Sequence, residues 1–159
     1  MSRMERYEDF HAWKLAHALH KKVCAMTSEP PASLDFKFSN NLRDAADSAE
    51  RNFPEGFGRF GPGEFARFLD FSRASLLETK NELRVGLERG HFSRNDVREA
   101  TILANRALGA LSALQRYLRS PRAKENAKGI RDRLNAQDPI AKHAVESSTT
   151  QDPTDEPTN

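Results

Sequence analysis

The 159-residue sequence lacks the features that mark several classes of protein. It has one cysteine, Cys24, so no disulfide can form within the chain, which suits a reducing compartment. Its 25 Lys and Arg residues nearly balance 23 Asp and Glu residues, so net charge alone predicts neither a nucleic-acid nor a membrane partner. No apolar run approaches the ~20 residues that cross a bilayer, and the N-terminus has no signal-peptide core. We therefore expect a cytoplasmic protein with no membrane partner.

Helical periodicity is what the sequence has instead. Four segments carry apolar residues at spacings of three and four, which is typical of helices with one buried face. Turn residues separate them, because Pro30 and Pro31 end the first segment and Pro62 suits the first turn of the third. Gly90 suits the end of the third helix, and Ser93 suits the N-cap of the fourth. The expected core stripes include Leu15, Leu19 and Val23; Leu42, Ala46 and Phe53; Phe65, Leu69 and Leu76; and Ala100, Ala104 and Leu111.

These patterns predict one all-α domain, an up-down-up-down four-helix bundle over residues 1–120. Residues 121–159 form a polar tail, in which a short helix over 122–135 is possible because Ile130 and Leu134 share a face. From Gln137 onward the tail is rich in Pro, Asp, Ser and Thr and has little to bury. We therefore expect most of the tail to be disordered.

Two motifs suggest chemistry that their context does not support. Gly56, Gly58 and Gly61 spell the dinucleotide fingerprint, which needs a preceding strand, whereas a helix is predicted there. Glu88 and His91 have the spacing of a di-iron motif, which would need a second copy and two further glutamates. No nucleophile is grouped with a base in the sequence. We expect no enzyme activity, no cofactor and no small-molecule substrate.

One face of the first predicted helix carries His17, His20 and Cys24, and Phe10 and Trp13 continue the same stripe. Imidazole and thiolate are zinc ligands, but three ligands from one helix leave a site open. We therefore predict no metal and interpret the stripe as a second contact face, which packs on another subunit or on the tail.

A basic cluster surrounds the predicted turn between the third and fourth helices. Arginine stripes of this kind can follow nucleic-acid phosphates, whereas the interleaved acids Glu82, Glu88, Asp96 and Glu99 favour a self-paired, solvated face. Both interpretations stay open. The candidate nucleic-acid contacts are Arg84, Arg89, Arg94, Arg98 and Arg106.

The segment from Leu42 to Arg59, and above all Glu55-Gly56-Phe57-Gly58-Arg59, resembles the signature of the four-helix-bundle family encoded in 23S rRNA intervening sequences. Glu64–Leu69 and Arg73–Glu78 match that family's third helix, and Trp13 matches an aromatic residue in its first. The resemblance covers about residues 7–119. Two residues depart from the family pattern: Lys80 stands where an acid is usual, and Pro54 replaces a small helix former, so we expect it to kink or shorten the second helix.

The resemblance implies a homo-oligomer, often pentameric, with no settled activity. Relatives in fold include accessory proteins of diversity-generating retroelements, which associate with nucleic acid through basic surfaces. Our leading hypothesis is a non-enzymatic pentameric scaffold, in which Glu55 and Arg59 frame a glycine hinge that serves assembly or fold specification. The alternative is a nucleic-acid accessory protein that uses an Arg-rich face of the oligomer. The expected oligomer contacts are Phe10, Trp13, His17, His20, Cys24, Phe57 and Phe60.

Overall fold

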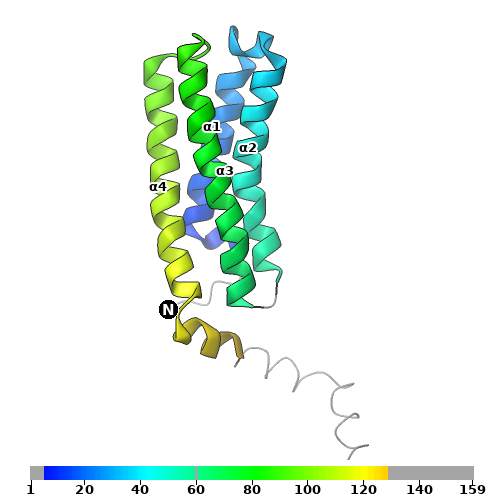
Figure 1. Ribbon diagram of the computed structural model, residues 1–159, viewed down its shortest axis with the longest axis vertical. Helices are drawn as coiled ribbons and strands as arrows, with labels where there is room; N and C mark the ends of the chain where they lie inside the picture. Colours follow the sequence, from blue (N-terminus) through cyan, green and yellow to red (C-terminus); the bar gives the residue numbers. More distant parts are fainter. Residues whose placement is uncertain (1–5, 60, 129–159) are drawn as a thin grey trace, which may run out of the picture.

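The computed structural model describes residues 6–59 and 61–128. All regular structure in these ranges is helical, which confirms the predicted all-α class. Four long helices pack side by side (Figure 1): α1 (His11–Ser28), α2 (Phe36–Phe57), α3 (Pro62–Glu88) and α4 (Arg94–Leu118). Two single-turn helices, η1 (Tyr7–Asp9) and η2 (Ala32–Leu34), precede α1 and α2.

The part of the chain that the structure describes holds one more α-helix than the four predicted for the bundle. Residues 121–128 form it directly after α4, within the span expected to carry a short helix. The expected continuation over 129–135 and the rest of the predicted disordered tail lie outside the described residues.

The long helices follow one another around the bundle. Each packs against the next, and α4 closes the circle against α1, so α2 and α4 are diagonal to each other. The α1–α2 and α3–α4 connections lie at one end of the molecule (Figure 1). The α2–α3 connection and the helix over 121–128 lie at the other end.

Local capping chemistry sets the ends of these helices. The Ser93 hydroxyl accepts a hydrogen bond from the Asp96 N–H at 3.1 Å, as expected for the start of α4. Pro62 opens α3 in its first turn. Gly90 has φ +74° directly after α3, where the following His91 N–H reaches back to the Gly86 carbonyl at 2.8 Å.

The prediction that Pro54 shortens α2 is wrong. The helix continues to Phe57, and the Gly58 N–H bonds to the Pro54 carbonyl at 3.0 Å. Proline lacks an N–H and its ring crowds the carbonyl four residues earlier, but contacts of the last turn with α3, such as that of Phe57 with Phe65, hold the helix beyond it. Gly56 and Phe57 are therefore helical, and the glycine-rich connection is shorter than the sequence suggested.

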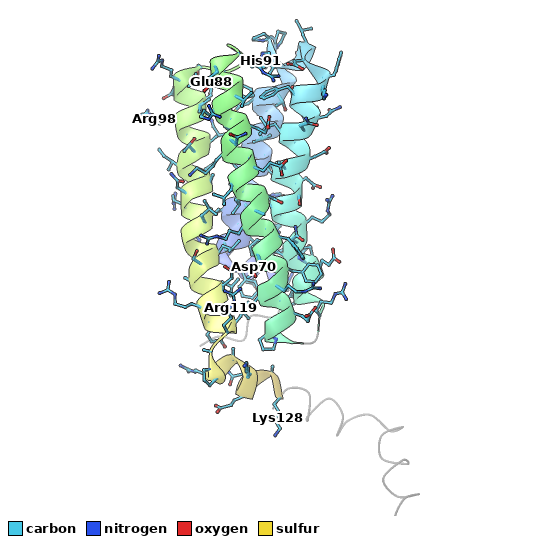
Figure 2. All side chains as sticks on the ribbon, viewed as in Figure 1. Asp70, Glu88, His91, Arg98, Arg119 and Lys128 are labelled. Carbon is cyan, nitrogen blue, oxygen red and sulfur yellow. The ribbon has the colours of Figure 1, made fainter. Side chains whose placement is uncertain are left out.

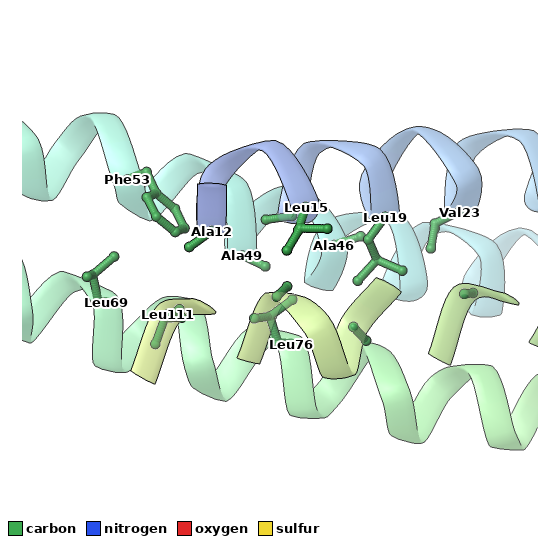
Figure 3. Close-up of a cluster of buried hydrophobic side chains, with 14 of the residues drawn as sticks. Ala12, Leu15, Leu19, Val23, Ala46, Ala49, Phe53, Leu69, Leu76 and Leu111 are labelled. Carbon is green, nitrogen blue, oxygen red and sulfur yellow. The ribbon is translucent and has the colours of Figure 1, made fainter. Parts of the chain in front are cut away.

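Leucine, alanine and phenylalanine side chains from all four long helices fill the centre of the bundle (Figure 3). Each fully buried leucine contributes about 1.5–3 kcal/mol through removal of apolar surface from water. The buried hydroxyls of Thr27 and Ser72 donate to the carbonyls of Val23 and Ala49, so they do not leave unpaired polar groups in the core. The largest fully buried apolar side chains are Leu19, Val23, Leu42, Phe53, Leu69, Leu76, Leu83 and Leu111.

Candidate functional site

The two phenylalanines predicted as oligomer contacts, Phe10 and Phe57, face the chain's own interior. Phe10 is only 9 % exposed. Its ring meets those of Phe57 and Phe65 edge to face, with centroids 5.9 and 5.5 Å apart. This cluster closes one end of the bundle, where α1 begins, α2 ends and α3 begins. Phe60, the third phenylalanine in that prediction, lies outside the described residues.

Trp13 is half-buried against its own chain. Its ring stacks on His17 at 4.8 Å and meets Tyr7 edge to face at 5.6 Å. The indole N–H is buried and finds no acceptor in the described part of the molecule. The predicted contact stripe of α1 is thus largely used in contacts within the chain.

A single carboxylate, that of Glu50 on α2, holds both histidines of this stripe. The Nδ1 atoms of His17 and His20 lie 2.9 Å from its two oxygens. The Glu50 side chain is only 19 % exposed, so these two hydrogen bonds join α1 to α2 at a position that is largely shielded from solvent. Sequence reasoning missed Glu50 because it is at least 30 residues from either histidine. Cys24, the last member of the stripe, is a free, half-buried thiol.

The signature segment Glu55–Arg59 anchors the end of α2 on α3. A Cβ at Gly56 would lie 2.6 Å from Phe68 Cβ and 2.8 Å from Phe65 Cδ2, so only glycine allows this approach. The Arg59 guanidinium lies 5.1 Å from the Phe68 ring and 3.4 Å from the Glu55 carboxylate. Gly58 has φ −69°, a value open to any residue. The segment acts at a helix–helix contact, where the sequence suggested a glycine hinge.

The five arginines proposed for nucleic-acid contact do not share one environment. Arg84 pairs with Glu88, and Arg89 lies 3.4 Å from the Asp35 carboxylate. Arg98 donates to the neutral Asn95 amide oxygen at 2.9 Å and points away from the bundle (Figure 2). Within residues 6–59 and 61–128, Arg94 and Arg106 have no side-chain partner. The acids therefore neutralise the α3 end of the cluster and leave α4 cationic.

Asp35 and His91 join the two connections at the end of the bundle opposite the signature segment. The His91 Nε2–H donates to Asp35 Oδ2 at 3.0 Å, while Asp35 Oδ1 caps α2 by accepting the Phe38 N–H at 3.2 Å. The imidazole, followed by the Phe38 amide, holds the pKa of the Asp35 carboxyl below its ordinary value. The two nitrogens of His91 differ, because Nδ1 is buried and unpaired in the described structure.

A cavity of about 630 Å³ lies beside this junction, between the end of α1 and the α3–α4 connection. Two of its polar groups already have partners, since Lys22 Nζ lies 2.7 Å from Glu99 and Ser93 caps α4, whereas Nδ1 of His91, which also lines it, has none in the described structure. No three His, Cys, Asp or Glu side chains are placed to hold a metal ion among the residues described.

Several large apolar side chains lie on the outside of the protein. Leu34 and Phe36 are 72 % and 74 % exposed at the α1–α2 connection, and three others are about half exposed on α3 and α4. These residues were not singled out from the sequence. A signal was available, because they are large apolar residues that fall outside the predicted core stripes. The three on the long helices are Phe71, Leu77 and Ile102.

Comparison with known proteins gives a family. The model of the 23S rRNA-intervening sequence protein family matches residues 8–113, which is 106 of the 159 residues. No curated protein matches the chain. None of the described helices has the length and apolarity that a bilayer crossing needs.

Proposed function

Because the chain belongs to the 23S rRNA-intervening sequence protein family, we propose that it is a non-enzymatic scaffold that assembles from copies of itself. The assembling unit is the up-down-up-down four-helix bundle of α1 to α4. The assembly is a cytoplasmic pentameric ring, the form that the family resemblance implies.

The apolar side chains on the outer surfaces of α3 and α4 support this proposal. Phe71, Leu77 and Ile102 are each about half exposed, and they lie along the length of the bundle among charged residues. Apolar groups surrounded by charged and polar ones match the anatomy of a protein–protein interface.

Size exclusion with light scattering tests self-assembly. At tens of micromolar we expect a mass several times the 17.9 kDa of one chain. The Ile102→Asp variant should lower this mass, because an ionised carboxylate in an apolar contact loses its hydration. Leu34→Asp is the matched control, since Leu34 is exposed at the end of the bundle. A wild-type monomer at this concentration would contradict the proposal.

A second candidate function is association with nucleic acid through the arginines. It is supported by the cationic outer surface of α4, where Arg94 and Arg106 have no acidic partner within the described residues and Arg98 has only Asn95. Binding of short RNA and DNA, measured by fluorescence polarisation at about 50 and 200 mM salt, tests it. We expect affinity to fall steeply with salt and to fall further in Arg94→Ala/Arg106→Ala. Absence of binding at the lower salt would remove this candidate.

A further inference from the structure

We infer that copies of this chain meet through two unlike surfaces, the outer surface of α4 in one copy and the α2–α3 surface in the next. This inference rests on the proposed self-assembly and adds where the contact lies.

The first surface is a stripe along the outside of α4, here called the α4 face. Its residues follow spacings of three and four, and all of them are exposed. The single large apolar group, Ile102, is 50 % exposed between two arginines. A Cβ at Gly109 would meet nothing within 4 Å, so this glycine serves no packing need inside its own chain and leaves room for close approach from outside. The α4 face consists of Arg98, Ile102, Arg106, Gly109, Ala113 and Arg116.

Among the residues that the structure describes, no salt bridge joins an acid to the arginines of the α4 face. Arg98 bonds only to the Asn95 amide, and within the described residues neither Arg106 nor Arg116 has a side-chain partner. The nearest acid in sequence, Glu99, is bound to Lys22 of α1 at 2.7 Å. The surface is therefore cationic with an apolar centre.

The second surface lies where α2 meets α3, here called the α2–α3 face. The hydroxyls of Ser48 and Ser75 mark the meeting line, since they are hydrogen-bonded across it at 2.9 Å. Residues one or two turns away from them on the same side of each helix belong to this face. Its other members are Asp44, Phe71, Glu78 and Glu82.

The α2–α3 face is anionic with an apolar centre. Asp44, Glu78 and Glu82 have no cationic partner in the part of the chain that the structure describes. Phe71 is 48 % exposed and is supported from beneath by Phe68, with ring centroids 5.8 Å apart. The surface thus has the opposite charge to the α4 face and an apolar group of similar exposure.

Two arginines lie over the Phe68–Phe71 pair, Arg67 at 5.8 Å from the centre of the Phe71 ring and Arg59 at 5.1 Å from that of Phe68, and both are already paired with acids of their own. Arg59 lies 3.4 Å from the Glu55 carboxylate, and Arg67 lies at the same distance from Glu64. They therefore leave the acids of the α2–α3 face without local compensation.

The two faces cannot meet within one chain, because α2 and α4 are diagonal in the bundle. A contact between two α4 faces would oppose like charges, so a two-fold dimer through this surface is disfavoured. Contact between unlike faces is heterologous: it builds a ring if the rotation closes and a filament if it does not. Charge complementarity therefore selects a second copy of this chain as the occupant of each face.

The outer part of α1 already makes contacts within its own chain. His17 and His20 are bound to Glu50, and Trp13 packs on Tyr7 and His17. We therefore place the contact on the other three helices, whereas the sequence predicted it on α1.

Charge exchange tests the pairing of the faces. The α4 variant carries Arg98→Glu and Arg106→Glu, the α2–α3 variant carries Glu78→Arg and Glu82→Arg, and a third variant carries all four changes. In light scattering at about 150 mM salt, we expect each two-residue variant to fall toward the mass of one chain. We expect the four-residue variant to regain the wild-type mass, because the charges are again opposite. The matched control is Arg122→Glu/Glu125→Arg, whose side chains are exposed outside both faces.

The outcomes separate the inference from the function on which it rests. A monomeric wild type would contradict both the pairing of the two faces and the proposed self-assembly. An oligomeric wild type whose mass is unchanged in the two-residue variants, or is not regained in the four-residue variant, overturns the inference and leaves self-assembly in place. Loss of RNA binding in the α4 variant with unchanged mass assigns that face to nucleic acid and also overturns it. Circular dichroism checks folding, and Arg106→Glu and Glu78→Arg alone replace any variant that fails to fold.

Discussion

At the scale of single residues, two glycines in neighbouring segments have opposite requirements. A Cβ at Gly56 would overlap Phe68 and Phe65, whereas a Cβ at Gly63 would meet nothing within 4 Å. We expect Gly56→Ala to lower the free energy of unfolding by about 1–3 kcal/mol through overpacking. Gly63→Ala should raise it by about 0.4–1 kcal/mol, since the change restricts the unfolded chain. Urea denaturation measures both, and equal effects would contradict the assigned contact of Gly56 with α3.

Asp35 gives a prediction of acid sensitivity. The bond from His91, followed by that from the Phe38 amide, lowers the folded-state pKa of this carboxyl below its ordinary value of 3.8. A lowered pKa stabilises the folded state fully above the unfolded-state value, and this contribution disappears as pH falls through the folded-state pKa. The stability difference between wild type and Asp35→Asn should therefore be constant at neutral pH and shrink below about pH 4.

Urea denaturation of both proteins between pH 3 and pH 7 measures this difference. His91→Phe is the informative companion variant, because it removes the largest cause of the shift and keeps the cap on α2. The loss of unfolding free energy between pH 4 and pH 3 should be smaller in His91→Phe than in the wild type. A difference that grows toward acid would contradict the assignment.

At the scale of elements, Glu50 joins α1 to α2. Its carboxylate accepts from both His17 and His20, whereas an amide offers only one acceptor oxygen. We expect Glu50→Gln to lower the free energy of unfolding by about 1.5–3 kcal/mol at pH 7, the usual range for a hydrogen bond to a charged group. Glu55→Gln is the control: its salt bridge to Arg59 is exposed, so the change should be below about 0.5 kcal/mol. Similar losses in both variants would remove the special role of Glu50.

The ends of the helices show which features can be predicted from residues close in sequence and which cannot. Ser93, Pro62 and Gly90 predicted the ends they form, because capping depends on residues close in sequence. Pro54 was misread, since tertiary contacts of the last turn of α2 outweigh a local helix-breaking preference. The cap of α2 by Asp35 was missed because the start of this helix was taken from its apolar stripe, which begins only at Phe38.

At the scale of the whole molecule, assembly and stability should be coupled. If only the folded bundle associates, mass action stabilises it as the concentration rises. We expect the wild-type Tm to increase by roughly 5 °C between about 1 and 100 µM, and the α4 variant to show no such increase. Differential scanning fluorimetry or circular dichroism measures it. The Arg122→Glu/Glu125→Arg control should behave like the wild type, and a concentration-independent wild-type Tm would contradict the coupling.

The sequence by itself determined the helices of this protein and the side of each that is buried. Leu19, Leu42, Leu69 and Leu111 were predicted to be in the core and are fully buried, because a 3.6-residue period places such residues on one face of a helix. The family could also be recognised from the Glu55–Arg59 segment, and the match over residues 8–113 agrees with it.

Only the tertiary structure decided which residues meet. Glu50 with the two histidines and Asp35 with His91 are pairs separated by 30 to 56 residues. Their contacts depend on how each helix is rotated about its axis in the bundle, which no local pattern specifies. The same rotations place Phe10 inside and leave Phe71 and Ile102 outside. Which large apolar side chains are exposed therefore depends on the tertiary structure and could not be taken from the sequence pattern alone.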